Sequence, residues 1–417
     1  MPILSTRMPT RTKENYLKMP HGSLFSHLRN AQTRPLKTHG IHRIGEFLIK
    51  HYFLWFYYTI KNNFGKKHSF PDYPKGQTGI YKENFFSMAI VADWATDTKE
   101  SIHISKEMAS HNPDYTVHLG DTYYVGEPQE IYYNFLAPNA PWHKGKKGSF
   151  ALLGNHEMYA RGIAYFRCLL PHLGIYNTKT KQFNGQHAAF FCVENQFWRI
   201  LGLDTGYNSI TKIPWVEGDC SLEPKLIKWL QNVVKLGDKN DKRGIVFLMH
   251  HQCLTAFKNE GEFTKPAIQL AQLIGKDRPV IWVCGHEHKL SAFSKTQIRN
   301  GITAYVRCIG HGGMPIELKN KNFELCDSKM GCNSLVIVDK RVKEIKENLG
   351  HNGYAILNVQ NDKIEISYLD EKELLFTEKW KVDLTSGNIY GTIKAASVEI
   401  EKSLTEMTGK QLADAVK

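Results

Sequence analysis

The sequence has no CxxC pair among its eight cysteines, and it has no internal repeat and no low-complexity tract. The cysteines are scattered, and several stand inside apolar runs such as FRCLL and AFFCVE, as small core residues do. This pattern excludes a CxxC redox or metal motif and favours a reducing compartment. Cys326 and Cys332 are close enough for a short disulfide, although two free thiols are the simpler expectation.

The chain also has no apolar run long enough to span a bilayer, and its first twenty residues lack the apolar core of a secretory signal. The most apolar stretch, residues 47–60, contains Lys50 and His51. We expect this stretch to be a helix packed against the following domain, with attachment to a membrane surface as the alternative. The default expectation is a cytoplasmic protein, which leaves export by a non-standard route open.

Acidic residues are scarce in the first 80 positions, which hold 13 Lys and Arg but only 3 Asp and Glu. This segment therefore carries +10 of the net charge of +13. A basic arm of this kind can contact an acidic partner, anionic lipid or nucleic acid, or it can simply be a solvated tail. No combined basic and aromatic pattern specific to nucleic-acid recognition is present.

The order of apolar and polar segments predicts an α/β protein. Residues 1–79 are expected to form a basic extension with a helix over about 44–62 and a Pro/Gly-rich linker over 71–79. Residues 80–380 alternate strands and helices and then become rich in strands, which predicts two stacked sheets flanked by helices, the second sheet being formed by strands between about 302 and 370. Residues 381–417 are expected to be a tail with a terminal helix.

Five short segments end in metal-ligand side chains after an apolar run. They are MAIVAD, ending at Asp93, HLGDTYY (118–124), LLGNHE (152–157), VFLMHH (246–251) and CGHEH (284–288). One Asp after a strand is commonly a helix cap, and one His is commonly a core residue. Because ligands gather beyond the carboxyl ends of strands in open α/β sheets, the five together predict one site. Carboxylate and imidazole donors suit zinc, iron and manganese, and two such ions can activate a water for phosphoryl transfer.

These motifs, in this order, resemble those of the calcineurin-like metallophosphoesterases, and the resemblance extends from Asp93 to about Asp370. It implies a two-sheet αββα fold, two metal ions and a phosphorylated substrate. By this resemblance Asp93 and His288 bind the first metal, Asp121 bridges the two, and the second metal is bound by Asn155, His250 and His286. His156 would act as general acid or stabilise the transition state.

One departure from the family pattern concerns the first motif, which is usually Asp-x-His but is Asp93-Trp94-Ala95 here. Tyr124, three residues after Asp121, can replace the missing imidazole, as in the purple acid phosphatases, which the chain resembles in this respect. The implied metals are Fe(III) and a divalent ion, Zn, Mn or Fe. The alternative is that one of the neighbouring tyrosines, Tyr123 or Tyr124, packs in the core while the other points outward.

A second departure is that the chain lacks the additional His residues with which plant purple acid phosphatases bind phosphate. His251, His311 or Lys258 can take that role, or they can be loop residues without one. The expected function is a phosphomonoesterase in which a metal-bridging hydroxide attacks phosphorus and His156 assists the leaving group. The alternatives are a phosphodiesterase or nuclease using the same metals, and a metal-free scaffold protein.

Overall fold

The computed structural model describes residues 66–211, 217–316, 318, 323–326, 328–343, 349–404 and 413–416. The helix expected over 44–62 and most of the basic extension lie outside these residues. Among the described residues, no helix is both long enough and apolar enough to cross a membrane.

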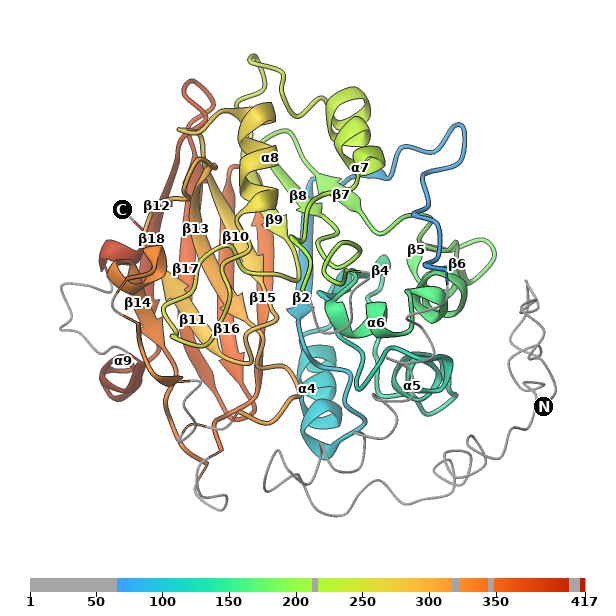
Figure 1. Cartoon of the computed structure of the whole chain (residues 1–417), viewed down its shortest axis with the longest axis horizontal. Helices are drawn as coiled ribbons and strands as arrows, with labels where there is room; N and C mark the ends of the chain where they lie inside the picture. Colours follow the sequence, from blue (N-terminus) through green and yellow to red (C-terminus); the bar gives the residue numbers. More distant parts are fainter. Residues whose placement is uncertain are drawn as a thin grey trace.

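Two sheets packed face to face form the centre of the molecule (Figure 1). The first has the strand order β1 (Ile80–Lys82), β7 (Phe191–Glu194), β8 (Trp198–Gly202), β9 (Gly244–Leu248), β10 (Pro279–Cys284), β13 (Thr303–Ile309), β11 (Leu290–Phe293) and β14 (Leu335–Val338), with β12 (Thr296–Gln297) beside β13. The second has the order β18 (Ile389–Ala395), β17 (Leu374–Val382), β16 (Lys363–Asp370), β15 (Gly353–Gln360), β2 (Phe85–Val91), β3 (Tyr115–His118), β4 (Gly148–Ala151), β5 (Gly174–Asn177) and β6 (Gln182–Phe183).

Helices flank both sheets. The α-helices are α4 (Lys99–Ser110), α5 (Pro128–Ile131), α6 (Asn155–Tyr159), α7 (Pro224–Trp229), α8 (Lys265–Ile274) and α9 (Val398–Leu404). Shorter π and 3₁₀ segments are η2 (Tyr132–Leu136), η3 (Tyr165–Leu169), η4 (Leu170–His172), η5 (Leu230–Val234), η7 (Met330–Asn333) and η8 (Ala413–Val416). Figure 1 shows α8 alongside β9 and β10. The predicted α/β architecture of two sheets flanked by helices is confirmed.

Strand β2 shows why the sheets stack in this way. Met88 and Ile90 belong to the apolar cluster between the sheets, whereas Ala89 and Val91 belong to the cluster that includes Ile104 of α4. Successive side chains of a strand point to opposite faces, so an unbroken apolar run fits a strand that is covered on both sides. The helix that follows, α4, begins at a capping box in which Thr98 and Ser101 each accept the other's backbone N–H, at 3.3 and 3.1 Å.

The division of strands between the sheets differs from the expectation. We expected the strands after residue 302 to form the second sheet by themselves, but β13 and β14 join β10 in the first sheet, and β15 pairs with β2. The second sheet also continues beyond residue 380, because β18 lies inside the segment that we expected to be a tail. The helix expected in that tail is present as α9.

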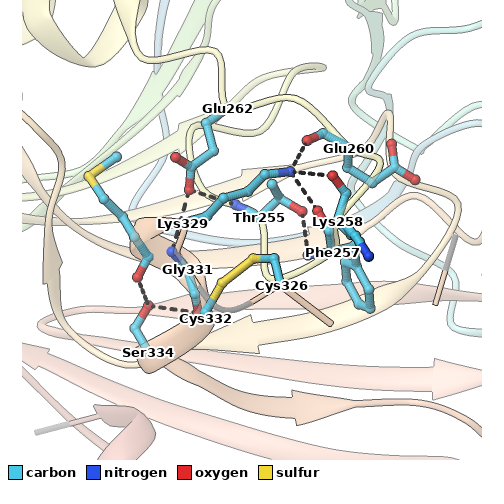
Figure 2. Close-up of a disulfide and its surroundings, with 11 residues drawn as sticks. Thr255, Phe257, Lys258, Glu260, Glu262, Cys326, Lys329, Gly331, Cys332 and Ser334 are labelled. Atoms are coloured by element: carbon cyan, nitrogen blue, oxygen red, sulfur yellow. Dashed lines mark hydrogen bonds between the residues drawn. A yellow bond between two sulfur atoms is a disulfide. The ribbon is translucent and has the colours of Figure 1, made fainter. Parts of the chain in front are cut away.

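A disulfide joins Cys326 and Cys332, contrary to the simpler expectation of free thiols. Between them, the Lys329 ammonium donates to three backbone carbonyls of a neighbouring loop, those of Phe257, Lys258 and Glu260 (Figure 2). The Glu262 carboxylate accepts the backbone N–H groups of Thr255 and Gly331. These contacts attach the disulfide-closed segment to the loop that follows β9. The other six cysteines are free and buried.

Candidate metal centre

The five motifs meet where the carboxyl ends of strands from both sheets come together. Asp93, Asp121 and Asn155 follow the parallel strands β2, β3 and β4 of one sheet. His250 and His286 follow the parallel strands β9 and β10 of the other. We expected a single sheet edge to carry all five residues. The structure instead brings two edges together, so the site lies at one end of the sandwich.

The first group of donors surrounds the hydroxyl of Tyr123. This oxygen lies 2.8 Å from Asp93 Oδ1, 3.1 Å from Asp121 Oδ2 and 2.9 Å from His288 Nε2. His288 Nε2 is itself 3.5 Å from Asp93 Oδ1. A phenol has one proton to donate, so Tyr123 can donate to only one of the two carboxylates at a time. These short distances show that the four side chains direct their polar atoms at the same small volume.

The second group surrounds the side-chain oxygen of Asn155. His286 Nδ1 lies 2.9 Å from this oxygen and His250 Nε2 lies 3.2 Å from it. His250 Nε2 is also 3.4 Å from Asp121 Oδ2, the same carboxylate oxygen that Tyr123 contacts. Asp121 thus stands between the two groups, where a bridging ligand would be.

The structure differs from the sequence-based expectation at the tyrosine. The phenol oxygen that reaches the two aspartates is that of Tyr123, whereas Tyr124 contributes its backbone carbonyl and the edge of its ring to His156. Tyr123 is 2% exposed and Tyr124 is only half-buried. A spacing of three residues after Asp121 indicated Tyr124, but the path of the backbone turns the preceding side chain inward.

Backbone conformation brings the donors close. Asp93, Asp121 and His286 have positive φ values of 55°, 71° and 68°, a region that costs a non-glycine residue about 1–3 kcal/mol and is concentrated at functional sites. The glycines of the motifs permit the approach of the carboxylates. A Cβ on Gly154 would lie 2.0 Å from Asp121 Oδ1, and a Cβ on Gly285 would lie 2.4 Å from Asp93 Oδ2. Any larger residue at Gly154 or Gly285 would therefore collide with a carboxylate of the centre.

Backbone N–H groups orient the carboxylate oxygens that are not directed at the centre. His286 N donates to Asp93 Oδ2 at 2.8 Å, and His156 N donates to Asp121 Oδ1 at 2.9 Å. The buried Glu157 carboxylate accepts Asp121 N at 3.1 Å and Gly154 N at 2.8 Å. Sequence reasoning missed this role of Glu157, although a Glu three residues after the glycine at the start of a helix is the signal of a capping box.

His156 is placed with one ring nitrogen toward the site and the other away from it. Its Nδ1 donates to the backbone oxygen of Tyr124 at 2.7 Å, and its Nε2 lies 3.8 Å from Asp121 Oδ2. The hydrogen bond at Nδ1 sets the ring orientation and leaves Nε2 to exchange a proton. Burial lowers the pKa of His156, and the charge of Asp121 opposes that shift.

The two histidines expected to contact substrate are both buried, each 1% exposed. His251 Nδ1 lies 3.0 Å from the hydroxyl of Thr205, and its ring centroid is 4.7 Å from that of His286. His251 thus belongs to the centre itself and could serve as a further imidazole donor there. The His311 ring lies against Gly353 of β15, where a Cβ would be 2.5 Å from His311 Nε2. The structure offers no support for a substrate contact through His311.

The donor set fits metal ions. His250, His251 and His286 form one group whose ligand atoms lie within 4.8 Å of one another, and Asp93, Asp121 and His250 form another. Asp93 and Asp121 are 0% and 1% exposed, and within the described residues their ion-pair partners are histidines alone. Two buried carboxylates without a lysine or arginine need another source of positive charge, which metal ions would supply.

In the metal-free protein, His250 supplies part of that positive charge. Burial disfavours the charge of Asp121, but His250 and His156 outweigh it and hold the pKa of Asp121 well below its usual range. Burial lowers the pKa of His250, yet the Asp121 charge raises it overall to about 9. Burial, then the charges of Asp121 and Asp93, raise the pKa of Tyr123 well above its ordinary value. A phenolate at this position would therefore require a strong Lewis acid.

Comparisons with known proteins identify the family. The model of the calcineurin-like phosphoesterases matches residues 86–290, a segment that contains all five motifs. No curated protein matches the chain. Similar solved structures are GAP50, the anchor in the inner membrane complex of Plasmodium (13% identity, TM-score 0.45, 79% of this chain and 99% of that one), PhoD (11%, 0.47, 76% and 73%) and a dimetal phosphatase from Danio rerio (11%, 0.41, 71% and 99%).

With identities of 11–13% and TM-scores below 0.5, these structures say nothing about the substrate of this chain. The family model matches the part of the chain that carries the donor cluster. Residues 86–290 therefore belong to the calcineurin-like phosphoesterase family, and the protein is a metal-dependent phosphoric ester hydrolase.

Proposed function

We propose that the protein is a phosphomonoesterase with two metal ions, Fe(III) and a divalent ion. The observation that carries the proposal is the position of the Tyr123 hydroxyl, within 3.1 Å of both aspartates and of His288. Tyr123, Asp93 and His288 would hold the first ion, Asn155, His250 and His286 the second, and Asp121 both. The purple acid phosphatases also have a tyrosine at the first metal, so the resemblance to them remains although the hydroxyl here belongs to Tyr123 and not to Tyr124. That resemblance favours a monoester.

Two metal ions bound here would supply a water of lowered pKa and positive charge for the phosphoryl oxygens. The chain itself positions the reacting groups. Asp121 and Asp93 are fixed by backbone N–H groups at their outer oxygens, so their inner oxygens keep one orientation. His156 holds its Nε2 toward the centre and can give a proton to the leaving oxygen of the substrate.

The substrate class is tested by comparing hydrolysis of p-nitrophenyl phosphate with that of bis(p-nitrophenyl) phosphate. Metal-free protein is reconstituted with iron together with zinc or manganese before the assay. We expect kcat/KM for the monoester to exceed that for the diester by about tenfold or more, and Asp121→Asn to lose both activities. A preference for the diester would overturn the monoesterase assignment while leaving the metal centre in place.

His156 has a separate prediction. His156→Ala should lower kcat by about 10²- to 10⁴-fold, the usual contribution of a positioned acid, and leave the metal content unchanged. The loss should be smaller for substrates with good leaving groups, because those need no proton. Equal losses for p-nitrophenyl phosphate and an alkyl phosphate would contradict the role of His156 as the acid.

A further inference from the structure

A carboxylate outside the five motifs holds the segment that carries Tyr123. Glu130 lies on α5, and its side chain turns back onto the loop before that helix. Glu130 Oε1 accepts the backbone N–H of Tyr124, and Oε2 accepts those of Val125 and Glu127 at 3.0 and 3.1 Å. One side chain thus binds three backbone amides within four consecutive residues.

The Tyr124 backbone connects this carboxylate to the reacting groups. Its N–H is bound by Glu130, and its carbonyl accepts the Nδ1 proton of His156 at 2.7 Å. The residue before it is Tyr123, whose hydroxyl lies among the aspartates. A shift of the Tyr124 backbone would therefore move the Tyr123 side chain and the acceptor that orients His156 together.

Other backbone hydrogen bonds also hold this part of the chain. Asp121 N donates to Glu157, Tyr123 N donates to the Ala95 carbonyl at 2.9 Å, and Gly126 N donates to the Thr122 carbonyl at 2.9 Å. The amides of Tyr124 and Val125 point instead toward Glu130. Without this acceptor, two adjacent N–H groups would lose their partner within a loop in which every residue except Tyr124 is buried, which is unfavourable.

We propose that Glu130 is a positioning residue of this enzyme, which clamps the 122–127 loop so that Tyr123 and His156 keep their places. A carboxylate suits three N–H donors, because both of its oxygens accept hydrogen bonds. Burial and the charge of Glu127 raise the pKa of Glu130 to about 8, and the three N–H groups oppose that shift. Glutamine has the same shape, but its NH₂ group would face a backbone N–H. This proposal rests on the proposed function for its catalytic consequence, whereas the clamp itself is a property of the metal-free protein.

The experiment compares wild type with Glu130→Gln and with the control Glu365→Gln, the same chemical change at a partly exposed residue of β16. Hydrogen–deuterium exchange of metal-free protein is followed in a peptide that covers the 122–127 loop. We expect exchange in this loop to be about tenfold or more faster in Glu130→Gln, because adjacent backbone amides lose part of their acceptor. The control should exchange like wild type.

The loaded enzyme gives the second readout. Glu130→Gln should lower kcat by about tenfold or more with KM changed by less than about twofold, because it displaces reacting groups and touches no substrate. Any phenolate-to-iron absorption band should shift as well. Glu130→Asp, which keeps the carboxyl group but retracts it by one methylene, should fall between wild type and Glu130→Gln in both measurements.

Unchanged exchange and unchanged kcat in Glu130→Gln would overturn the clamp. Unprotected exchange of the same loop in wild type would also overturn it, and this measurement needs no variant to fold. Faster exchange in Glu130→Gln would support the clamp even if wild type hydrolysed no phosphoester. The clamp and the proposed function can therefore fail separately.

Discussion

At the scale of single residues, the choice between two adjacent tyrosines is the sharpest feature of the site. Tyr123→Phe should lower the iron content and remove any visible charge-transfer band, because the phenol oxygen that it deletes lies 2.8 Å from Asp93. Tyr124→Phe is the matched control, since it removes a hydroxyl from the next residue and keeps the carbonyl that orients His156. Metal analysis and visible spectra check both variants. The reverse result, a colourless Tyr124→Phe and a coloured Tyr123→Phe, would restore the expectation from the motif spacing.

Most of the candidate centre could be predicted from the sequence. Asp93, Asp121, Asn155, His250 and His286 each end an apolar strand, and the structure does bring their side chains together. Their roles as metal ligands remain predictions.

The tyrosine could not be chosen in the same way. Spacing along the chain does not determine which of two neighbours turns inward when a residue before them, Asp121, has a positive φ of 71°. Glu130 stands two residues after Pro128, at the third position of α5, which is the signal of a capping box, but that signal does not show that the loop of Tyr123 folds back onto its side chain.

At the scale of elements, one buried ion pair links the two sheets. Arg307 of β13 donates through Nε to Glu378 Oε1 of β17 at 2.7 Å, and both side chains are fully buried. Tyr368 and Trp380 donate to the other carboxylate oxygen at 3.1 and 3.2 Å. Each buried charge is thus paired and hydrogen-bonded, as burial requires.

Removing one charge of this pair should destabilise the protein strongly. Glu378→Gln should lower the free energy of unfolding by about 3 kcal/mol or more, because it leaves the Arg307 charge buried without a counter-ion. Glu365→Gln of β16 is the control, since its partner Lys379 is 69% exposed and such a pair contributes about 0–1 kcal/mol. Urea unfolding measures both. Similar losses in the two variants would contradict the stated difference between buried and exposed pairs.

The allocation of strands to sheets shows what local patterns leave open. Strands β13 to β16 lie where their alternation or apolar runs predicted them, whereas β17 and β18 were not predicted. Their partners were not recognisable, because a parallel pair such as β10 and β13 and a long-range pair such as β2 and β15 depend on contacts across the whole chain. Periodicity identifies a strand and its buried face, but not its neighbour.

At the scale of the whole molecule, acid stability depends on an ionised cluster around Glu371. Its carboxylate lies 3.0 Å from Lys343 Nζ and 3.3 Å from His351 Nδ1. Burial would raise the pKa of Glu371, but the nearby His351 and the charge of Lys343 lower it from 4.5 to about 2. A depressed folded-state pKa means that the stabilisation is present above pH 4.5 and is lost as the pH falls toward 2.

The whole protein should therefore lose about 2–3 kcal/mol of stability from this one group over that pH range. Glu371→Gln should be less stable than wild type at neutral pH, and its thermal unfolding midpoint should fall less between pH 5 and about pH 2. Scanning calorimetry of both proteins across this range checks the prediction. Parallel curves for wild type and variant would show that Glu371 is not depressed in the folded state.

The central claim is that Asp93, Asp121, Tyr123, Asn155, His250, His286 and His288 hold two metal ions, one of them iron. The most direct measurement is the metal content of protein purified without chelators, determined by mass spectrometry together with the visible spectrum. We expect about two metal ions per chain, iron among them, with a charge-transfer band that Tyr123→Phe removes. Protein that binds no metal even after reconstitution with iron, zinc and manganese would contradict it.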